Sequence, residues 1–207
     1  MSAGIRPLRL AAAFGAVLAA ASGTATAKDY PPDRGWSTFW GAFVDEIAGP
    51  PGAEALKPLA HFEEAGIAFD YPAVLRVNYD AEDRQWRLWR GDFELEVHVG
   101  EYDADHAQRL LDMMGGVLHD GDEPAAAAEK APPLALCGKE TEGWRLRFTF
   151  LGDPHEYLAY TVMLGERDAR LFVFDDLLVD GKTSLAREAT LDNLRKSLRC
   201  IARAPDA

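Results

Sequence analysis

One short segment of this sequence carries side chains that could do acid–base chemistry. In residues 93–99, Glu94, Glu96 and His98 alternate with apolar residues. Alternate residues of a β-strand lie on one face, about 7 Å apart, so the two carboxylates and the imidazole would line one side of a strand. Such a strip fits a ligand-binding face or an acid–base pair. It fits equally well a solvated sheet face with weak cross-strand ion pairs.

A second alternating segment supplies cations. In residues 144–150, Arg145 and Arg147 alternate with large apolar residues. If this strand lay beside the first, its arginines would face the two carboxylates. The residues predicted to bind a ligand are therefore Glu94, Glu96, His98, Arg145 and Arg147.

Signatures of the common enzyme classes do not occur in the chain. It has no Gly-x-Ser-x-Gly elbow, no glycine-rich phosphate loop, no His-Glu-x-x-His and no Cys/His pattern with metal spacing. The acidic residues at 103–106 and 120–123 match no calcium loop and fit a helix cap and a surface loop. Residues 153–156 fit a hairpin turn better than a metal site. The sequence thus predicts no catalytic residue, metal ligand or cofactor.

Net charge narrows the range of partners. The 207 residues include 34 Asp and Glu against 22 Lys and Arg, a formal charge of −12. Nucleic acids and anionic membranes attract basic surfaces, so neither is an expected partner. An unidentified protein or small molecule is expected instead.

The first 27 residues have the pattern of a secretory signal peptide. Arg6 and Arg9 precede an uncharged apolar run at 10–21, and residues 25–27 read Ala-Thr-Ala, a cleavage-site pattern. The alternative is a membrane anchor, but the run is shorter than the roughly 20 residues of a spanning helix. No cysteine follows for lipid attachment. We therefore expect cleavage after Ala27, no stable membrane anchor afterwards, and a periplasmic or secreted location.

Export changes the expectation for Cys137 and Cys200, because oxidising compartments favour disulfides. A bond between them would close a loop of about 60 residues and add roughly 4 kcal/mol of stability. Leu191, Leu194 and Leu198 predict a helix over 185–201, and Cys200 would point away from that apolar stripe. The bond thus requires Cys200 to lie at the helix flank or beyond a frayed end. Two free thiols are the alternative.

Three helical or polar segments precede the first strand. Residues 28–35 are a polar lead-in, and residues 36–47 have four aromatic residues on the stripe of an amphipathic helix. That helix could be part of the core or could dock in a partner's groove. Residues 53–64 are predicted to form a second short helix.

Apolar residues then recur with period two, which is typical of strands. Strands are expected at 67–72, 74–79, 85–89, 93–99, 144–150, 157–164 and 171–174. A helix should follow Asp103, and a mobile loop should span 119–133. The prediction is a single α+β domain over 36–203, with an antiparallel sheet of about six strands. Residues 157–164 are apolar on both faces, which favours helices on both sides, an α/β/α sandwich.

This layout resembles the PsbP-like α/β/α sandwich family. The resemblance rests on Phe69-Asp70-Tyr71-Pro72 at the start of the strands and on Leu191, Leu194 and Leu198 in the last helix, and it covers about 66–203. Members are small, often exported, accessory or binding modules. The resemblance assigns no functional residue here.

The predicted function is an exported accessory or binding protein without catalytic activity. One alternative is a small hydrolase or lyase that uses the Glu94, Glu96 and His98 face. Another is a protein-interaction module that acts through the aromatic helix at 36–47.

Overall fold

A computed structural model describes residues 50–118, 126–150 and 152–201. The predicted signal peptide, polar lead-in and aromatic helix lie outside these ranges, as do residues 202–203 of the predicted domain. No helix in the described part of the chain is long and apolar enough to cross a membrane. The elements are β1 (Leu59–Glu64), β2 (Ile67–Pro72), β3 (Arg76–Asp80), β4 (Gln85–Arg90), β5 (Phe93–Glu101), α2 (His106–Val117), β6 (Glu129–Leu136), β7 (Lys139–Phe150), β8 (Asp153–Met163), β9 (Asp168–Leu177), α3 (Leu185–Ser197) and β10 (Arg199–Cys200).

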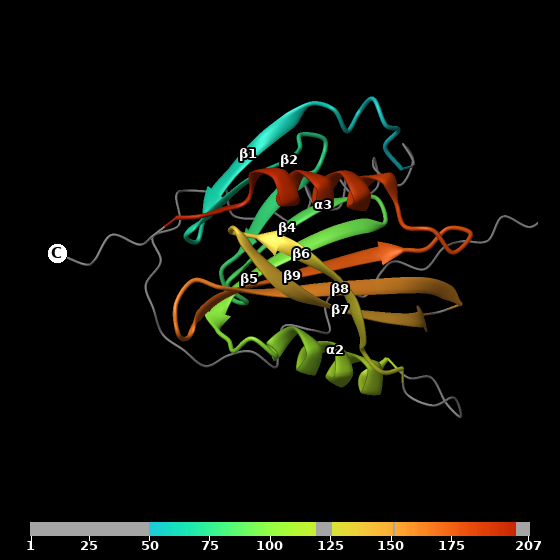
Figure 1. The fold of residues 1–207 in the computed structure, drawn as a ribbon. Helices are drawn as coiled ribbons and strands as arrows, with labels where there is room; N and C mark the ends of the chain where they lie inside the picture. Colours follow the sequence, from blue (N-terminus) through green and yellow to red (C-terminus); the bar gives the residue numbers. More distant parts are fainter. Residues whose placement is uncertain (1–49, 119–125, 151, 202–207) are drawn as a thin grey trace, which may run out of the picture.

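Ten strands form two antiparallel sheets in the described residues. The larger has seven strands in the order β3-β4-β5-β9-β8-β7-β6, and the smaller has the order β1-β2-β10. Figure 1 shows α3 on one face of the large sheet and α2 on the other. The expected antiparallel sheet with helices packed on it is found, in a sheet-rich form with one more strand in the main sheet than the six expected and with a second sheet beside it.

Each face of the large sheet has its own apolar core. On one face, Phe172 and Phe174 of β9 pack with residues of α3 and of the small sheet. On the other face, Leu171 and Val173 of the same strand pack with Leu111 and neighbouring residues of α2. The alternation of side chains along a buried strand serves both cores, which explains why β8 and β9 are apolar on both sides.

Two of the expected elements are wrong. Residues 59–64 are strand β1 instead of the end of a helix, and β1 pairs with β2. The positive φ angles of Ala65 (56°) and Gly66 (75°) fit the tight two-residue turn that joins such a hairpin. Residues 129–133, expected in a mobile loop, belong to edge strand β6. Its register shifts between Ala131 and Leu134, where two prolines lack the N–H groups that a regular ladder needs.

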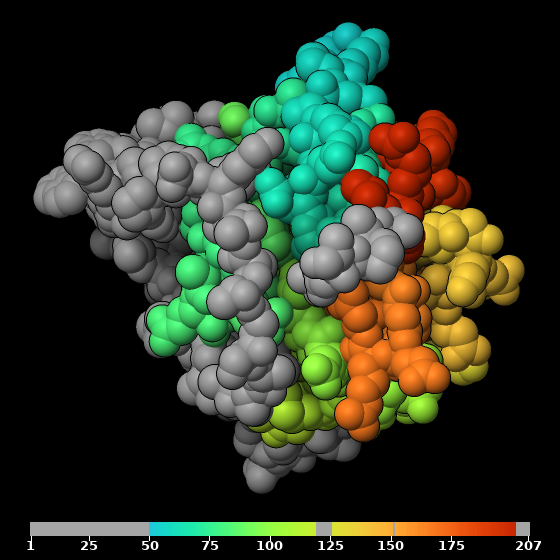
Figure 2. All heavy atoms as spheres, turned by 90° about the vertical axis from the view of Figure 1, so that its left-hand side faces the viewer, coloured from blue at the N-terminus to red at the C-terminus, as the bar shows by residue number. Residues whose placement is uncertain are grey.

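The chain after α3 departs from the expected helix. α3 ends at Ser197, and residues 199–200 form β10 against β2. Cys200 therefore lies beyond the helix, and its disulfide with Cys137 is confirmed, with the Cα atoms 5.3 Å apart. In Figure 2 yellow residues of the β6–β7 region lie beside the red residues of the chain's last described part, as the disulfide requires.

Candidate functional site

The structure does not bring the predicted ligand-binding residues together. Strands β9 and β8 lie between β5, which carries Glu94, Glu96 and His98, and β7, which carries Arg145 and Arg147. Directly opposed residues of paired strands point to one face, so the register can be followed across the sheet. Glu94 opposes Asp175, Asp175 opposes Tyr157 and Tyr157 opposes Leu146.

Leu146 therefore shares the face of Glu94, toward α2, and its neighbours Arg145 and Arg147 point to the opposite face, toward α3. The predicted grouping is wrong. Strands β8 and β9 follow β7 in the sequence but lie between β5 and β7 in the sheet, so the two strands that were expected to be adjacent are not neighbours.

The acidic residues of β5 are held by hydrogen bonds and ion pairs within the sheet. We call this group the acidic strip and define it as Gln85, Arg87, Glu94, Glu96 and His98. Arg87 Nε lies 3.5 Å from Glu94 Oε1 and 3.4 Å from Glu96 Oε1. His98 Nε2 lies 3.0 Å from Glu96 Oε2, and the Gln85 amide nitrogen can donate to His98 Nδ1 at 3.0 Å. Burial raises the pKa of Glu96, but the hydrogen bond with His98 and the charges of His98 and Arg87 outweigh it, so the pKa is lowered. Both imidazole nitrogens thus have partners within the protein.

The other acidic groups have structural partners. Asp103 accepts a hydrogen bond from Arg109 Nη2 at 2.7 Å, and His155 Nδ1 lies 3.2 Å from Asp175 Oδ1. Asp120, Asp122 and Glu123 lie outside the described residues. Within the described ranges, no group of three His, Cys, Asp or Glu residues is placed to hold a metal ion.

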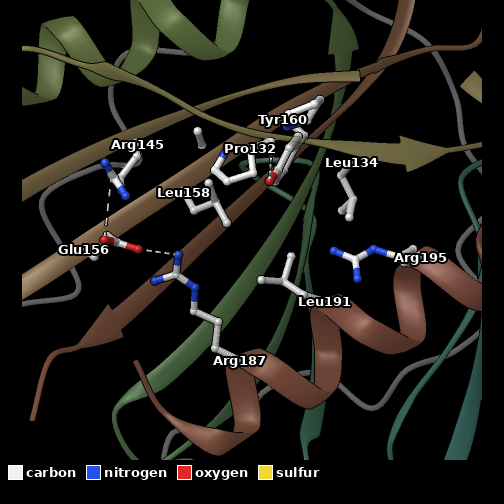
Figure 3. Close-up of a pocket in the computed structure, with 11 residues that line it drawn as sticks. Pro132, Leu134, Arg145, Glu156, Leu158, Tyr160, Arg187, Leu191 and Arg195 are labelled. Atoms are coloured by element: carbon white, nitrogen blue, oxygen red, sulfur yellow. Dashed lines mark hydrogen bonds and ion pairs between the residues drawn. The ribbon is translucent and has the colours of Figure 1, made fainter. Parts of the chain in front are cut away.

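A cavity of about 220 Å³ lies between α3 and strands β6, β7 and β8, on the face toward α3. We call it the arginine pocket. Its walls combine three arginines and one glutamate with a tyrosine and apolar side chains, as Figure 3 shows. The lining residues are Ala131, Pro132, Pro133, Leu134, Arg145, Glu156, Leu158, Tyr160, Arg187, Leu191 and Arg195.

The spacing of these residues along α3 and β8 directs their side chains into the pocket. Arg187, Leu191 and Arg195 are spaced four residues apart, so they follow one face of α3. Glu156, Leu158 and Tyr160 alternate along β8 and point to the same side of the sheet. The chain between β8 and α3 forms strand β9, which leads to the start of the helix.

Buried Glu156 is the centre of the charged end of the pocket. Its side chain is 4% exposed, and it accepts hydrogen bonds from Arg187 Nη2 at 2.5 Å and from Arg147 Nε at 2.6 Å. Burial raises the pKa of Glu156, but the charge of Arg187 and the bonds from Arg147 and Arg187 outweigh it, and the pKa is lowered. Glu156 is therefore ionised at neutral pH and compensates part of the arginine charge.

Positive charge remains in excess at this end. The Nη1 of Arg187 has no hydrogen-bond partner among the described residues, and neither has the Nε of Arg145, which lies 4.0 Å from Glu156 Oε2 in an ion pair. The Oδ1 of buried Asp176, whose carboxyl is within the influence of the Arg187 charge, also lacks a partner. The Arg187 side chain is 5% exposed. Arg145 Nη2 reaches outward to the exposed Glu129 Oε2 at 3.0 Å. A buried donor without a partner costs about 1–3 kcal/mol, a cost that an anion in the pocket would remove.

Tyr160 forms a polar wall that does not ionise at neutral pH. Its hydroxyl donates to the carbonyl oxygen of Pro132 at 3.0 Å, and burial raises its pKa. Its ring lies over Gly143 of β7, where an added Cβ would come within 2.4 Å of the ring. Glycine at this position therefore lets Tyr160 lie against the sheet.

The N-terminal end of α3 is anchored next to Arg187. Ser184 caps the helix by accepting from the Arg187 backbone N–H at 3.1 Å, and the Ser184 N–H donates to Asp176 Oδ2 at 2.7 Å. Asp176 lies opposite Glu156 in the sheet register and is fully buried, and this burial raises its pKa. These bonds position Arg187 over the pocket.

Sequence reasoning found only Arg145 among the residues that line the pocket, and Arg147 next to it. It missed Glu156, which it placed in a turn, and it missed Tyr160, Arg187 and Arg195. The available signal was the Arg-Leu-Arg spacing on α3 at 187, 191 and 195, which places two cations and an apolar residue on one helix face.

In comparisons with known proteins, the chain matches no protein-family model, and no curated protein matches it. A crystal structure from Bacteroides thetaiotaomicron VPI-5482 is similar over 70% of this chain, at 10% identity and a TM-score of 0.39, and this chain spans about half (48%) of that protein. LpqN, involved in cell envelope biogenesis of Mycobacterium tuberculosis, is 11% identical over 69% of this chain and 88% of its own, with a TM-score of 0.41. Cyanobacterial PsbP (CyanoP) from Synechocystis sp. PCC 6803 is 16% identical over 74% of this chain and 99% of its own, with a TM-score of 0.33. The resemblance to the PsbP fold is therefore weak, and likenesses of this size carry no information on function.

Proposed function

We propose that this protein is an exported, non-catalytic binding protein whose arginine pocket takes a small anionic ligand. One observation carries the proposal: Arg187 is buried in the wall of a cavity with an unpartnered Nη1. Natural proteins seldom leave a charged donor buried without a partner, so the missing acceptor is attributed to the ligand.

The charge of the pocket supports an anion over a cation. Arg145, Arg187 and Arg195 line it together with a single carboxylate, Glu156, which already accepts bonds from two arginines. The protein as a whole is acidic, so this local positive charge contrasts with the rest of the molecule.

The chemistry of the lining residues supports binding over catalysis. The described residues that line the pocket include no serine, threonine, cysteine, histidine or lysine that could act as nucleophile or base. Glu156 is ionised and held by two arginines, and the Tyr160 hydroxyl is engaged by Pro132. The periplasmic or secreted location is part of the proposal, and it is supported by the signal-peptide pattern and by the disulfide.

Benzoate and its neutral isostere benzamide test the proposal. Titration of the protein, followed by backbone amide chemical shifts in NMR spectra, should show benzoate bound with a Kd on the order of millimolar, as expected for a ligand of about nine heavy atoms. The shifted amides should belong to β6, β8 and α3. Benzamide should bind at least tenfold more weakly, because it cannot pair with Arg187.

Three variants make the test specific. Arg187→Gln should abolish benzoate binding, and Leu191→Trp should block the pocket without changing its charge. Arg167→Gln is the matched control, because Arg167 is exposed in the turn between β8 and β9 and does not line the pocket. Equal binding of benzoate and benzamide, or shifts scattered away from the pocket, would overturn the proposal even if Arg187→Gln fails to fold.

A further inference from the structure

We propose that the ligand is a short α,ω-dicarboxylate, two carboxylates joined by an apolar chain. The inference rests on the proposed function, since it names the ligand class of the same pocket. It follows from the order of side chains along the cavity, which is cationic at both ends and apolar between them.

The two cationic ends are set by α3. Arg187 and Arg195 are eight residues apart on one helix face, which places their Cα atoms about 12 Å apart along the axis. Leu191 lies midway between them. Figure 3 shows Arg187 and Arg145 beside Glu156 at one end of the cavity, Arg195 at the other, and Leu191 between the two ends.

The middle of the cavity suits a methylene chain. Leu158 of β8, Leu191 of α3 and Pro132 of β6 line it, and the Tyr160 hydroxyl beside them already donates to the Pro132 carbonyl oxygen. Full burial of one methylene strengthens binding by at most about fourfold. A compact anion such as inorganic phosphate would leave these apolar walls against water, so the pocket favours a ligand with an apolar spacer.

The two ends are unequal, which assigns a different role to each carboxylate. Arg187 lines the cavity and is only 5% exposed, so a carboxylate that pairs with it there would be largely desolvated. Arg195 is exposed at the rim, and its charge reaches Tyr160 in the pocket wall. A monocarboxylate would satisfy the deep end alone, whereas a dicarboxylate would reach both.

Size and neighbouring groups exclude other ligand classes. A volume of about 220 Å³ corresponds to roughly seven waters, below the range of drug-sized sites, so the chain must be short. An amino acid would need a partner for its ammonium group, and the one carboxylate that lines the pocket, Glu156, already accepts from Arg147 and Arg187. A peptide added as a strand to β6 would lose ladder bonds at Pro132 and Pro133.

The decisive comparison is heptanoate against pimelate, which have equal chain length and differ by one carboxylate. At physiological ionic strength, calorimetric titration should show pimelate bound up to about fivefold more tightly, the contribution of one exposed ion pair. In the series from succinate to azelate, affinity should pass through a maximum. Arg195→Gln should reduce pimelate affinity to that of heptanoate and leave heptanoate unchanged. Arg167→Gln should change neither.

The outcomes separate the two proposals. If heptanoate and pimelate bind equally and Arg195→Gln has no effect, the dicarboxylate assignment is wrong, and an anion site at Arg187 remains. If neither carboxylate shifts the amides of the pocket, the proposed function fails as well. Because Arg195 is exposed, its substitution should leave the fold intact, so this comparison does not depend on the stability of an Arg187 variant.

Discussion

Replacing Glu156 by glutamine should destabilise the protein and strengthen anion binding at the same time. Glu156 is the carboxylate that accepts from Arg187 Nη2 in the pocket wall, and both side chains are at most 5% exposed. Removal of one partner leaves the other charge buried and uncompensated, at a cost of about 3–5 kcal/mol. Arg147, the second partner, is 57% exposed and can turn to solvent, so the lower end of that range, about 3 kcal/mol, is expected.

The loss of stability in Glu156→Gln should also depend on pH. The pKa of Glu156 is lowered in the folded protein, so its contribution to stability is complete above its unfolded pKa of 4.5 and is lost as pH falls through the lower folded value. Urea unfolding at pH 7 should therefore show the full loss in Glu156→Gln. The difference between the variant and the wild type should shrink in acid.

Glu129→Gln is the matched control. Glu129 also pairs with a pocket arginine, Arg145, at 3.0 Å, but it is 69% exposed, so the loss should stay below about 1 kcal/mol. In Glu156→Gln, benzoate affinity should rise, because the pocket loses the one carboxylate that lines it. Equal stabilities of the two variants at pH 7, or weaker anion binding by a folded Glu156→Gln protein, would refute the electrostatic account of the pocket.

Three further predictions concern the elements that hold the pocket. Reduction of Cys137–Cys200, which spans 63 residues, should lower the free energy of unfolding by roughly 4 kcal/mol, measured by urea titration with and without reductant; an unchanged midpoint would contradict a stabilising cross-link. Asp176→Asn should be at least as stable as the wild type at pH 7, because burial raises the pKa of Asp176 and its ionisation costs stability as pH rises; a large loss at pH 7 would show that the charge is needed. Gly143→Ala should displace the Tyr160 ring and weaken benzoate binding, detected as a shift of the Tyr160 resonances, and unchanged resonances would contradict the close approach.

Much of the local structure could be predicted because it depends on short-range periodicity. The alternation of residues 93–99 matches β5, and the apolar spacing after Asp103 matches α2. β1 could not be recognised, because Leu56, Leu59 and Phe62 have the spacing of a helix. In the strand Leu59 is exposed and Phe62 is buried, since residues three apart lie on opposite faces. The edge strand β6 could not be recognised either. Its two prolines are typical of a loop, and only its pairing with β7 identifies it as a strand.

The candidate site depended on information that local patterns do not contain. Alternation determines that Glu94, Glu96 and His98 share one face of a strand and that Arg145 and Arg147 share one face of another. It does not determine which strands are neighbours, because pairing is a property of distant segments. β9 pairs with β5 although the two strands are far apart in the sequence, and β9 and β8 therefore separate the acidic residues of β5 from the arginines of β7.

By itself, the sequence determined the acidic character of the protein, the strand at 157–164 that is apolar on both faces, the presence of a helix after Asp103 and of a last helix from 185, and the pair of cysteines, because each follows from residue type and local spacing. The tertiary structure alone decided that Arg187 meets Glu156, 31 residues earlier in the chain, and that Leu191 lines the cavity between Arg187 and Arg195. The physical reason is that a side chain is buried only when separate elements pack together. A buried charge needs a partner more than an exposed one does, so burial is what favours binding of a charged ligand there.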